Sequence, residues 1–137
     1  MCICTGRPTS GKLPIRFGTY NIRNGHIGVL DSALWGVSLA NMDLSILQET
    51  KLTDGIYTRR SAGCSVVATD APSRHRGGVA IFHRPAPHFG LEAVRKYGPN
   101  VIGFQLETGA WRWYIVECYL APDNTSTIER VVEALRD

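Results

Sequence analysis

A short apolar run that ends abruptly in polar and charged residues constrains the fold of this chain most. Residues 44–51 read LSILQETK, so four largely apolar residues lead directly into Gln48, Glu49 and Lys51. A run of this length with polar boundaries is typical of a buried strand. The strand would carry Glu49 to its end, where carboxylate oxygens can bind a hard metal ion. A second strand-like segment, residues 15–22, would bring Asn21 to the same sheet edge.

Length, composition and charge limit the classes of protein to which this chain can belong. A length of 137 residues, with 44% hydrophobic and 20% charged residues, suits one globular domain. The formal charge of +3 permits a phosphate-bearing partner without requiring one. No apolar stretch approaches the ~20 residues that cross a bilayer, and no signal sequence precedes the domain. We therefore expect an intracellular protein, nuclear or cytoplasmic, with no membrane partner.

The cysteines predict neither disulfides nor a zinc centre. Cys2, Cys4, Cys64 and Cys118 match no disulfide framework, so reduced thiols are expected. A zinc site at the first two would need histidines at ligand spacing, and the four histidines do not supply it.

Local patterns divide the chain into a tail and one domain. Residues 1–12 are rich in Thr, Ser, Gly and Pro and predict a loose N-terminal tail, so the domain comprises residues 13–137. Apolar spacing predicts a helix over 27–42, and apolar runs predict strands at 64–69 and 79–83. Residues 53–62, with an Asp-Gly turn signal, are expected to form a loop.

The C-terminal part predicts a hairpin and then a helix. Segments 100–107 and 111–119 flank Thr-Gly-Ala and have strand character. Residues 126–129 have the form of a capping box, and Ile128, Val131, Val132 and Leu135 make a helical stripe. Trp111 and Trp113, which alternate on the second hairpin strand, are expected to pack in the core rather than stack on bases. This order of elements indicates a layered α/β domain.

Two motifs resemble a known superfamily. Residues 19–23, TYNIR, followed by residues 47–51, LQETK, resemble the opening of the endonuclease/exonuclease/phosphatase superfamily. Within it, residues 40–84 are most similar to the endonuclease domain of fungal LINE-type (non-LTR) retrotransposons. The resemblance implies the first half of a four-layer α/β sandwich, truncated, with a mixed sheet and flanking helices. It also implies a Mg2+-dependent or Mn2+-dependent phosphodiesterase that cleaves DNA.

The resemblance gives expected roles to individual residues. It implies that Glu49 is the metal ligand and that Asn21 and Tyr119 are catalytic, the amide orienting the attacking group and the hydroxyl reaching the scissile phosphate. From the residues alone, Glu49 could equally form a surface ion pair with Lys51. Basic side chains near the strand ends are expected to contact nucleic acid, by the geometry that suits guanidinium and phosphate: Arg23, Lys51, Arg74 and Arg76.

The resemblance covers only the first half of the superfamily domain. The chain contains no Gly-Asp-x-Asn, Ser-Asp-His or Asp-His sequence, which in relatives supply a further acid, an amide and the base that activates water. Hydrolysis needs an activated nucleophile as well as charge stabilisation. We therefore expect the isolated chain to be inactive.

A truncated sandwich has a physical consequence as well. One sheet would leave bare an apolar face larger than the ~600 Å² that is usual on soluble monomers. A complete domain should be a monomer, whereas the fragment should oligomerise or aggregate. Two other functions stay open: a degenerate, non-catalytic nucleic-acid-binding module, and a repair-type or small-phosphate hydrolase of the same superfamily.

Overall fold

Two β-sheets lie face to face in the computed structural model, which describes residues 2–5, 15–23, 32, 36, 41–53, 57–61, 64–84, 89–109, 111–120 and 125–137. The five-stranded sheet has the order β2-β3-β6-β5-β4 and the four-stranded sheet the order β1-β9-β8-β7. The strands of the first sheet are β2 (Phe17–Asn21), β3 (Leu44–Gln48), β4 (Tyr57–Ser61), β5 (Cys64–Ala68) and β6 (Val79–His83). Those of the second are β1 (Cys2–Thr5), β7 (Phe89–Gly98), β8 (Val101–Thr108) and β9 (Arg112–Cys118).

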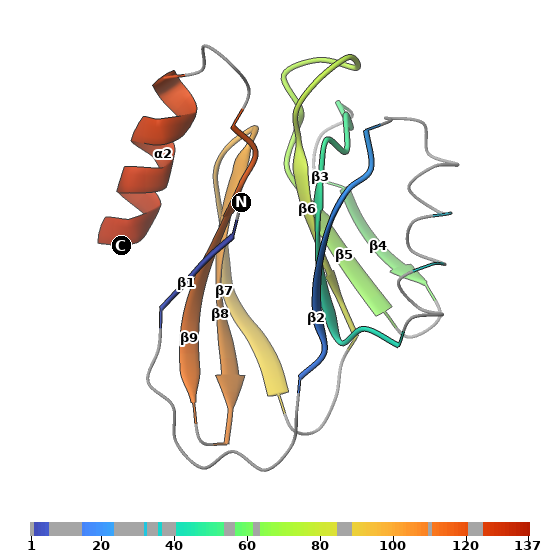
Figure 1. The fold of residues 1–137 in the computed structure, drawn as a ribbon, viewed down its shortest axis with the longest axis vertical. Coiled ribbons are helices and arrows are strands. Elements are labelled where there is room, and N and C mark those ends of the chain that lie inside the picture. Colours follow the sequence, from blue (N-terminus) through green and yellow to red (C-terminus); the bar gives the residue numbers. More distant parts are fainter. Residues whose placement is uncertain are drawn as a thin grey trace.

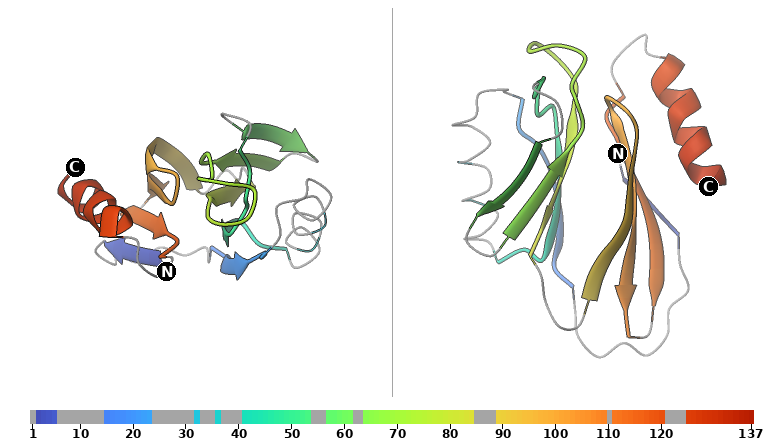
Figure 2. Two further views of the ribbon diagram at one scale, coloured as in Figure 1. Left: turned by 90° about the horizontal axis from the view of Figure 1, so that it is seen from above. Right: turned by 180° about the vertical axis from the view of Figure 1, so that it is seen from behind.

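The helix α2 (Thr125–Arg136) covers the outer face of the four-stranded sheet (Figures 1 and 2). Seen from above in Figure 2, α2, one sheet and the other sheet form successive layers. The chain is thus an α/β domain of two packed sheets. The helix expected over 27–42 lies almost wholly outside the described residues, although Ser32 and Gly36 are helical.

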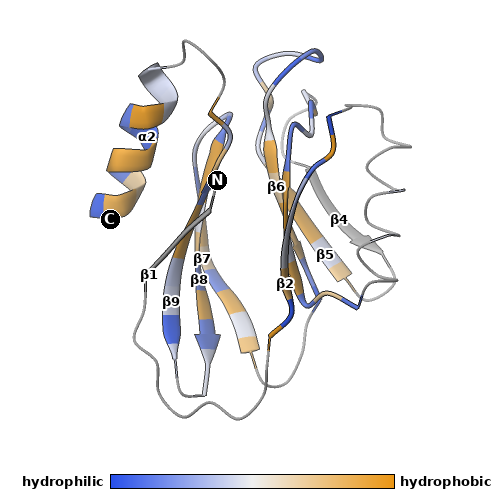
Figure 3. Ribbon diagram, in the orientation of Figure 1, coloured by the Kyte–Doolittle hydropathy of each residue, from blue (hydrophilic) through white to orange (hydrophobic). Residues whose placement is uncertain are grey.

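The largest core cluster lies between the sheets, where apolar side chains from both meet, and two further clusters lie on the other face of the five-stranded sheet and under α2 (Figure 3). Strand β3 is buried along its whole length, as its apolar run predicts, and Leu44 and Ile46 face Phe104 and Ile115 of the other sheet. The expectation of a bare apolar sheet face is therefore wrong for the described residues. The chain itself supplies both sheets, because β7, β8 and β9 return to cover the first one.

The predicted hairpin is confirmed, since β8 and β9 pair antiparallel from Val101↔Cys118 to Glu107↔Arg112. Near the turn, the rings of Trp111 and Trp113 stack with centroids 4.9 Å apart. Trp113 packs against the core between the sheets, as expected.

Two segments differ from the expected organisation. Residues 2–5 are not a loose tail, because β1 pairs antiparallel with β9 over Cys2↔Glu117 to Thr5↔Tyr114 and satisfies backbone groups at that edge. The remaining residues of the expected tail lie outside the described ones. Within the expected loop 53–62, residues 57–61 form β4 at the outer edge of the five-stranded sheet.

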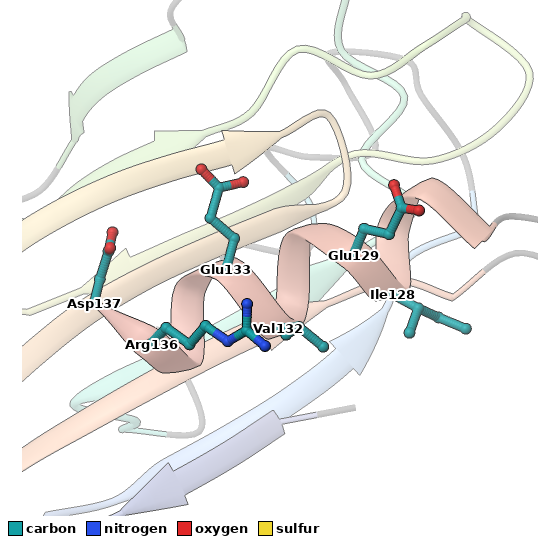
Figure 4. A pocket seen from close by; sticks show the side chains of 6 residues that line it. All are labelled: Ile128, Glu129, Val132, Glu133, Arg136 and Asp137. Atoms are coloured by element: carbon teal, nitrogen blue, oxygen red, sulfur yellow. The ribbon is translucent and has the colours of Figure 1, made fainter.

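Helix α2 forms where the capping box predicts, but it buries a neighbouring face. Thr127, Val131 and Ala134 pack toward the sheet, whereas Ile128 and Val132 are exposed. The buried positions are spaced i, i+4, i+7 and include Val131 of the expected stripe. The other three members of that stripe follow the buried positions by one residue, about 100° around the helix, and are exposed. The outward side bears a shallow hollow lined by the residues labelled in Figure 4: Ile128, Glu129, Val132, Glu133, Arg136 and Asp137.

Cys64 and Cys118 are buried free thiols, in agreement with the sequence. Among the described residues, no helix has the length and apolar character needed to cross a bilayer.

Candidate active site

The ends of β2 and β3 bring Asn21 and Glu49 together. The two strands run parallel, with Asn21 aligned to Gln48, so both strands end at the same edge of the sheet (Figure 1). There the Asn21 side-chain amide donates a hydrogen bond to Glu49 Oε1 at 3.4 Å. The two residues singled out by the motifs therefore share one rim of the sheet.

The backbone around this rim is unusual. Arg23, Glu49 and Lys51 have φ values of 55°, 55° and 54°, a left-handed conformation that non-glycine residues rarely adopt. Such conformations cost about 1–3 kcal/mol each and persist only where surrounding structure holds them. The Lys51 amide donates to the carbonyl of Gly77 at 2.9 Å, which holds the segment after Glu49 in place.

Lys51 lies beside the Glu49 carboxylate and links it to the Arg23 backbone. The Lys51 ammonium donates to the Arg23 carbonyl at 2.6 Å and lies 3.9 Å from Glu49 Oε2. The Arg23 amide in turn donates to Asn21 Oδ1 at 3.0 Å. The Glu49 and Lys51 side chains are 20% and 16% exposed, so both remain accessible from solvent. The Glu49–Lys51 ion pair, which the sequence left open as an alternative role for Glu49, is thus present within a larger cluster.

Tyr119, directly after β9, joins the same cluster from the other sheet. Its hydroxyl forms a hydrogen bond with the Glu49 carboxylate. This bond, together with burial and the negative charge of Glu49, raises the pKa of Tyr119, while the nearby Arg76 guanidinium opposes the rise. The Tyr119 hydroxyl therefore points at the rim.

Arg74 and Arg76 lie on the turn between β5 and β6, where Ser73 and Arg76 form an isolated bridge. Both arginines are exposed. Arg76 acts on Tyr119 electrostatically, whereas Arg74 makes no contact with Asn21, Glu49 or Tyr119 among the described residues. The structure thus brings four of the other six predicted site residues to Glu49, places Arg76 near Tyr119 and leaves Arg74 apart on the turn. Six residues form what we call the Glu49 cluster: Asn21, Arg23, Glu49, Lys51, Arg76 and Tyr119.

Asn100 supports the cluster and was not predicted. Its side-chain oxygen accepts a hydrogen bond from the Gly78 amide at 2.9 Å, and its carbonyl accepts one from the Tyr119 amide at 3.0 Å. Asn100 is 3% exposed. It therefore links the Gly77–Gly78 turn, whose carbonyl holds the Lys51 amide, to the backbone of Tyr119. A polar residue directly after Pro99 and before an apolar strand is the signal that could have pointed to it.

Gln48 and Glu117 were also missed. The Gln48 amide nitrogen donates to Glu117 Oε1 at 2.6 Å across the gap between the sheets. Glu117 is fully buried, and this burial raises its pKa to about 7 although the Gln48 hydrogen bond opposes the rise. A lone acid in the apolar run of β9 was the available signal.

The Tyr119 contact predicts a measurable titration. We expect the 13Cζ resonance of Tyr119 to titrate above the ordinary tyrosine value of 10.0, because the Glu49 carboxylate and burial both favour the protonated phenol. In Glu49→Gln the midpoint should fall toward that value, whereas Glu92→Gln, on exposed β7, should leave it unchanged. A Tyr119 midpoint unaffected by Glu49→Gln would show that the contact does not exist in solution.

Comparison with known proteins finds similarity among solved structures. No family model matches the chain, and neither does any curated protein. Among solved structures, the crystal structure of the AP endonuclease LMAP from Leishmania major is similar, with a TM-score of 0.56 and 18% sequence identity. The match covers 90% of this chain but 45% of that one. The chain therefore has the fold of an AP endonuclease over less than half of that protein's length.

Proposed function

We propose that this chain is the N-terminal half of a metal-dependent phosphodiesterase of the endonuclease/exonuclease/phosphatase superfamily, with DNA as its substrate. The observation that carries the proposal is the convergence of Asn21, Glu49 and Tyr119 from three strand ends and both sheets. The fold shared with an AP endonuclease supports the superfamily. The LINE-type origin rests on the resemblance of residues 40–84.

The residues present fit Mg2+ or Mn2+ better than zinc. Among the described residues, no group of three or more His, Cys, Asp or Glu side chains could enclose an ion. Magnesium keeps several waters and needs only one or two protein carboxylates beside a substrate phosphate. Glu49 would hold the ion through its accessible carboxylate, with Asn21 Oδ1 as a neighbouring hard oxygen. When bound, the ion neutralises charge on the phosphodiester.

The other members of the cluster suit a phosphodiester. The Tyr119 hydroxyl is a hydrogen-bond donor aimed at the rim, where it can contact a phosphate oxygen. Lys51 and Arg76 place positive charge near Glu49 and Tyr119, and the exposed side chains of Arg23 and Arg74 are free to add to it on a bound phosphodiester. Asn21 fixes the Glu49 carboxylate and the Arg23 backbone at once. These groups bind and orient, and the base that would activate water is expected in the second half.

A non-catalytic nucleic-acid-binding module is the second candidate. The chain spans less than half of its structural relative, and the cationic groups around Glu49 could bind a DNA backbone without any metal. Both candidates predict that the isolated chain does not nick supercoiled plasmid. They differ in what a divalent ion does to DNA binding.

The deciding experiment measures the affinity of the chain for a short labelled duplex at constant ionic strength. We expect Mg2+ to raise the affinity about tenfold over EDTA, equivalent to ~1.4 kcal/mol, because the ion bridges Glu49 and a phosphate. Glu49→Gln should abolish this increase, and the matched variant Glu92→Gln should retain it. Salt-dependent binding without any effect of Mg2+ would favour the non-catalytic module and contradict the proposed enzyme.

A further inference from the structure

A polar network of two buried side chains and one at the sheet edge lies beneath the Glu49 cluster. The side-chain amide nitrogen of Gln48 donates one hydrogen bond to Thr19 Oγ1 at 2.7 Å and another to Glu117 Oε1 at 2.6 Å. Thr19 is on β2, Gln48 on β3 and Glu117 on β9. A single amide group therefore connects three strands and joins the two sheets.

Each member of the network sits just before a residue of the cluster. Thr19 precedes Asn21 by two residues, and Glu117 precedes Tyr119 by two. Alternate residues of a strand face the same side, so each lies one layer deeper than its counterpart at the rim. Gln48 is the last residue of β3, and the left-handed turn at Glu49 begins immediately after it. The network thus connects the ends of the three strands that carry Asn21, Glu49 and Tyr119.

A role in packing alone does not account for Glu117. The residue is fully buried, and its Oε2 atom has no hydrogen-bond partner among the described residues. Burying a carboxyl group with one unsatisfied oxygen costs stability, and apolar residues of similar size usually stabilise such positions at least as well. A buried polar group of this kind calls for a specific explanation. The short hydrogen bond to Gln48 supplies one.

We propose that Gln48 and Glu117 are positioning residues for the Glu49 cluster. Glu117 orients the Gln48 amide. Because Gln48 is held by hydrogen bonds to both Thr19 and Glu117, it sets the direction in which the backbone turns at Glu49. The Glu49 carboxylate then meets the Asn21 amide and the Tyr119 hydroxyl instead of turning toward solvent. The inference rests on the proposed function only in its use of a divalent ion as a probe, since the geometry of the cluster can be measured without one.

The test uses the whole chain and two readouts. The first is the nuclear Overhauser contact between the Asn21 side-chain amide and the Glu49 side chain, which reports geometry directly. The second is the affinity for Mn2+ alone. Gln48→Met keeps the length of the side chain but removes both donated hydrogen bonds, and we expect it to lose the Asn21–Glu49 contact and to bind Mn2+ about tenfold more weakly or worse.

Two further variants separate positioning from folding. Glu117→Gln keeps an oxygen that can accept from Gln48, so it should preserve the contact and the affinity. Thr19→Val removes one acceptor at an exposed edge position, where folding is least affected, and should weaken the contact. The matched control Gln105→Met, at a half-buried position of β8, should change neither readout.

The outcomes distinguish this inference from the proposed function. An unchanged Asn21–Glu49 contact in folded Gln48→Met overturns the inference, and if that variant does not fold, an unchanged contact in Thr19→Val overturns it. Wild-type chain that shows the contact but binds no Mn2+ contradicts the proposed function, while the positioning role is still decided by the contact.

Discussion

Replacing Gly78 with alanine will lower the free energy of unfolding by about 3 kcal/mol, the largest effect we expect from a single methyl group in this chain. Gly78 has a φ of +86°, a conformation that side chains rarely adopt. An added Cβ would overlap Thr50 Oγ1 and would come within 3.1 Å of the Ala71 Cβ and 3.3 Å of the Lys51 amide nitrogen. The strain would therefore fall on the segment that follows Glu49.

Gly90 provides the matched control. It lies in β7, and an added Cβ there meets nothing within 4 Å. Gly90→Ala should leave stability unchanged or raise it by up to about 0.5 kcal/mol, as expected for alanine in a strand. Urea unfolding of both variants measures the difference. A Gly78→Ala variant within about 0.5 kcal/mol of the wild type would show that the turn is not packed against Thr50 and Lys51 as described.

The double variant Gly78→Ala, Thr50→Ala locates the strain. Removing the Thr50 hydroxyl eliminates the worst overlap but leaves the backbone conformation and the contact with the Lys51 amide. We expect recovery of roughly 1 kcal/mol relative to Gly78→Ala after the cost of Thr50→Ala is subtracted, which is a typical coupling energy for touching residues. If the losses of stability from the two substitutions simply add, the strain in Gly78→Ala does not come from the Thr50 hydroxyl.

Glu117 will make the protein less stable as the pH rises from about 4.5 to about 7. Burial raises the pKa of Glu117 to about 7 from its ordinary value of 4.5. Between these values the folded protein holds a proton that the unfolded chain has released, so the free energy of unfolding falls as the pH rises. The loss is complete above pH 7 and amounts to about 3 kcal/mol.

Comparison with Glu117→Gln isolates this effect from other titrating groups. The difference in free energy of unfolding between the variant and the wild type should grow in favour of the variant by about 2.5 kcal/mol from pH 5 to pH 8, because the glutamine never becomes charged. Urea unfolding at the two pH values gives the comparison, and exposed Glu92→Gln should show no such change. An equal wild-type to Glu117→Gln difference at both pH values would mean that Glu117 ionises normally.

The elements nearest the cluster were predictable because their signals are local. The apolar run 44–47 specifies a buried strand, and the polar residues that follow it must lie at its end. Because segment 15–22 also has strand character and carries Asn21 near its end, the meeting of Asn21 and Glu49 required only that the two strands pair in parallel. Tyr119 was located by its motif, but the direction of its hydroxyl depends on the packing of the second sheet.

The rest depends on contacts that no local pattern encodes. Gln48 and Glu117 are separated by 69 residues, and their hydrogen bond exists only because the two sheets pack face to face. Strand β7 escaped notice because it is an edge strand with charged residues, a left-handed Ala93 and register shifts between Glu92 and Gly98, which blur the alternation that marks a strand. The buried face of α2 was misjudged for the same reason: Ile128 and Val131 are equally apolar, and only the position of the sheet decides between them.

The central claim is that Asn21, Glu49 and Tyr119 form one site for a divalent ion, and paramagnetic broadening by Mn2+ tests it most directly. At substoichiometric Mn2+, the resonances of the Asn21 side-chain amide and the Tyr119 ring should broaden first, and Glu49→Gln should remove this selectivity. Broadening that begins elsewhere, such as at Glu129 and Glu133 on α2, or that persists at Asn21 and Tyr119 in Glu49→Gln, would contradict the account.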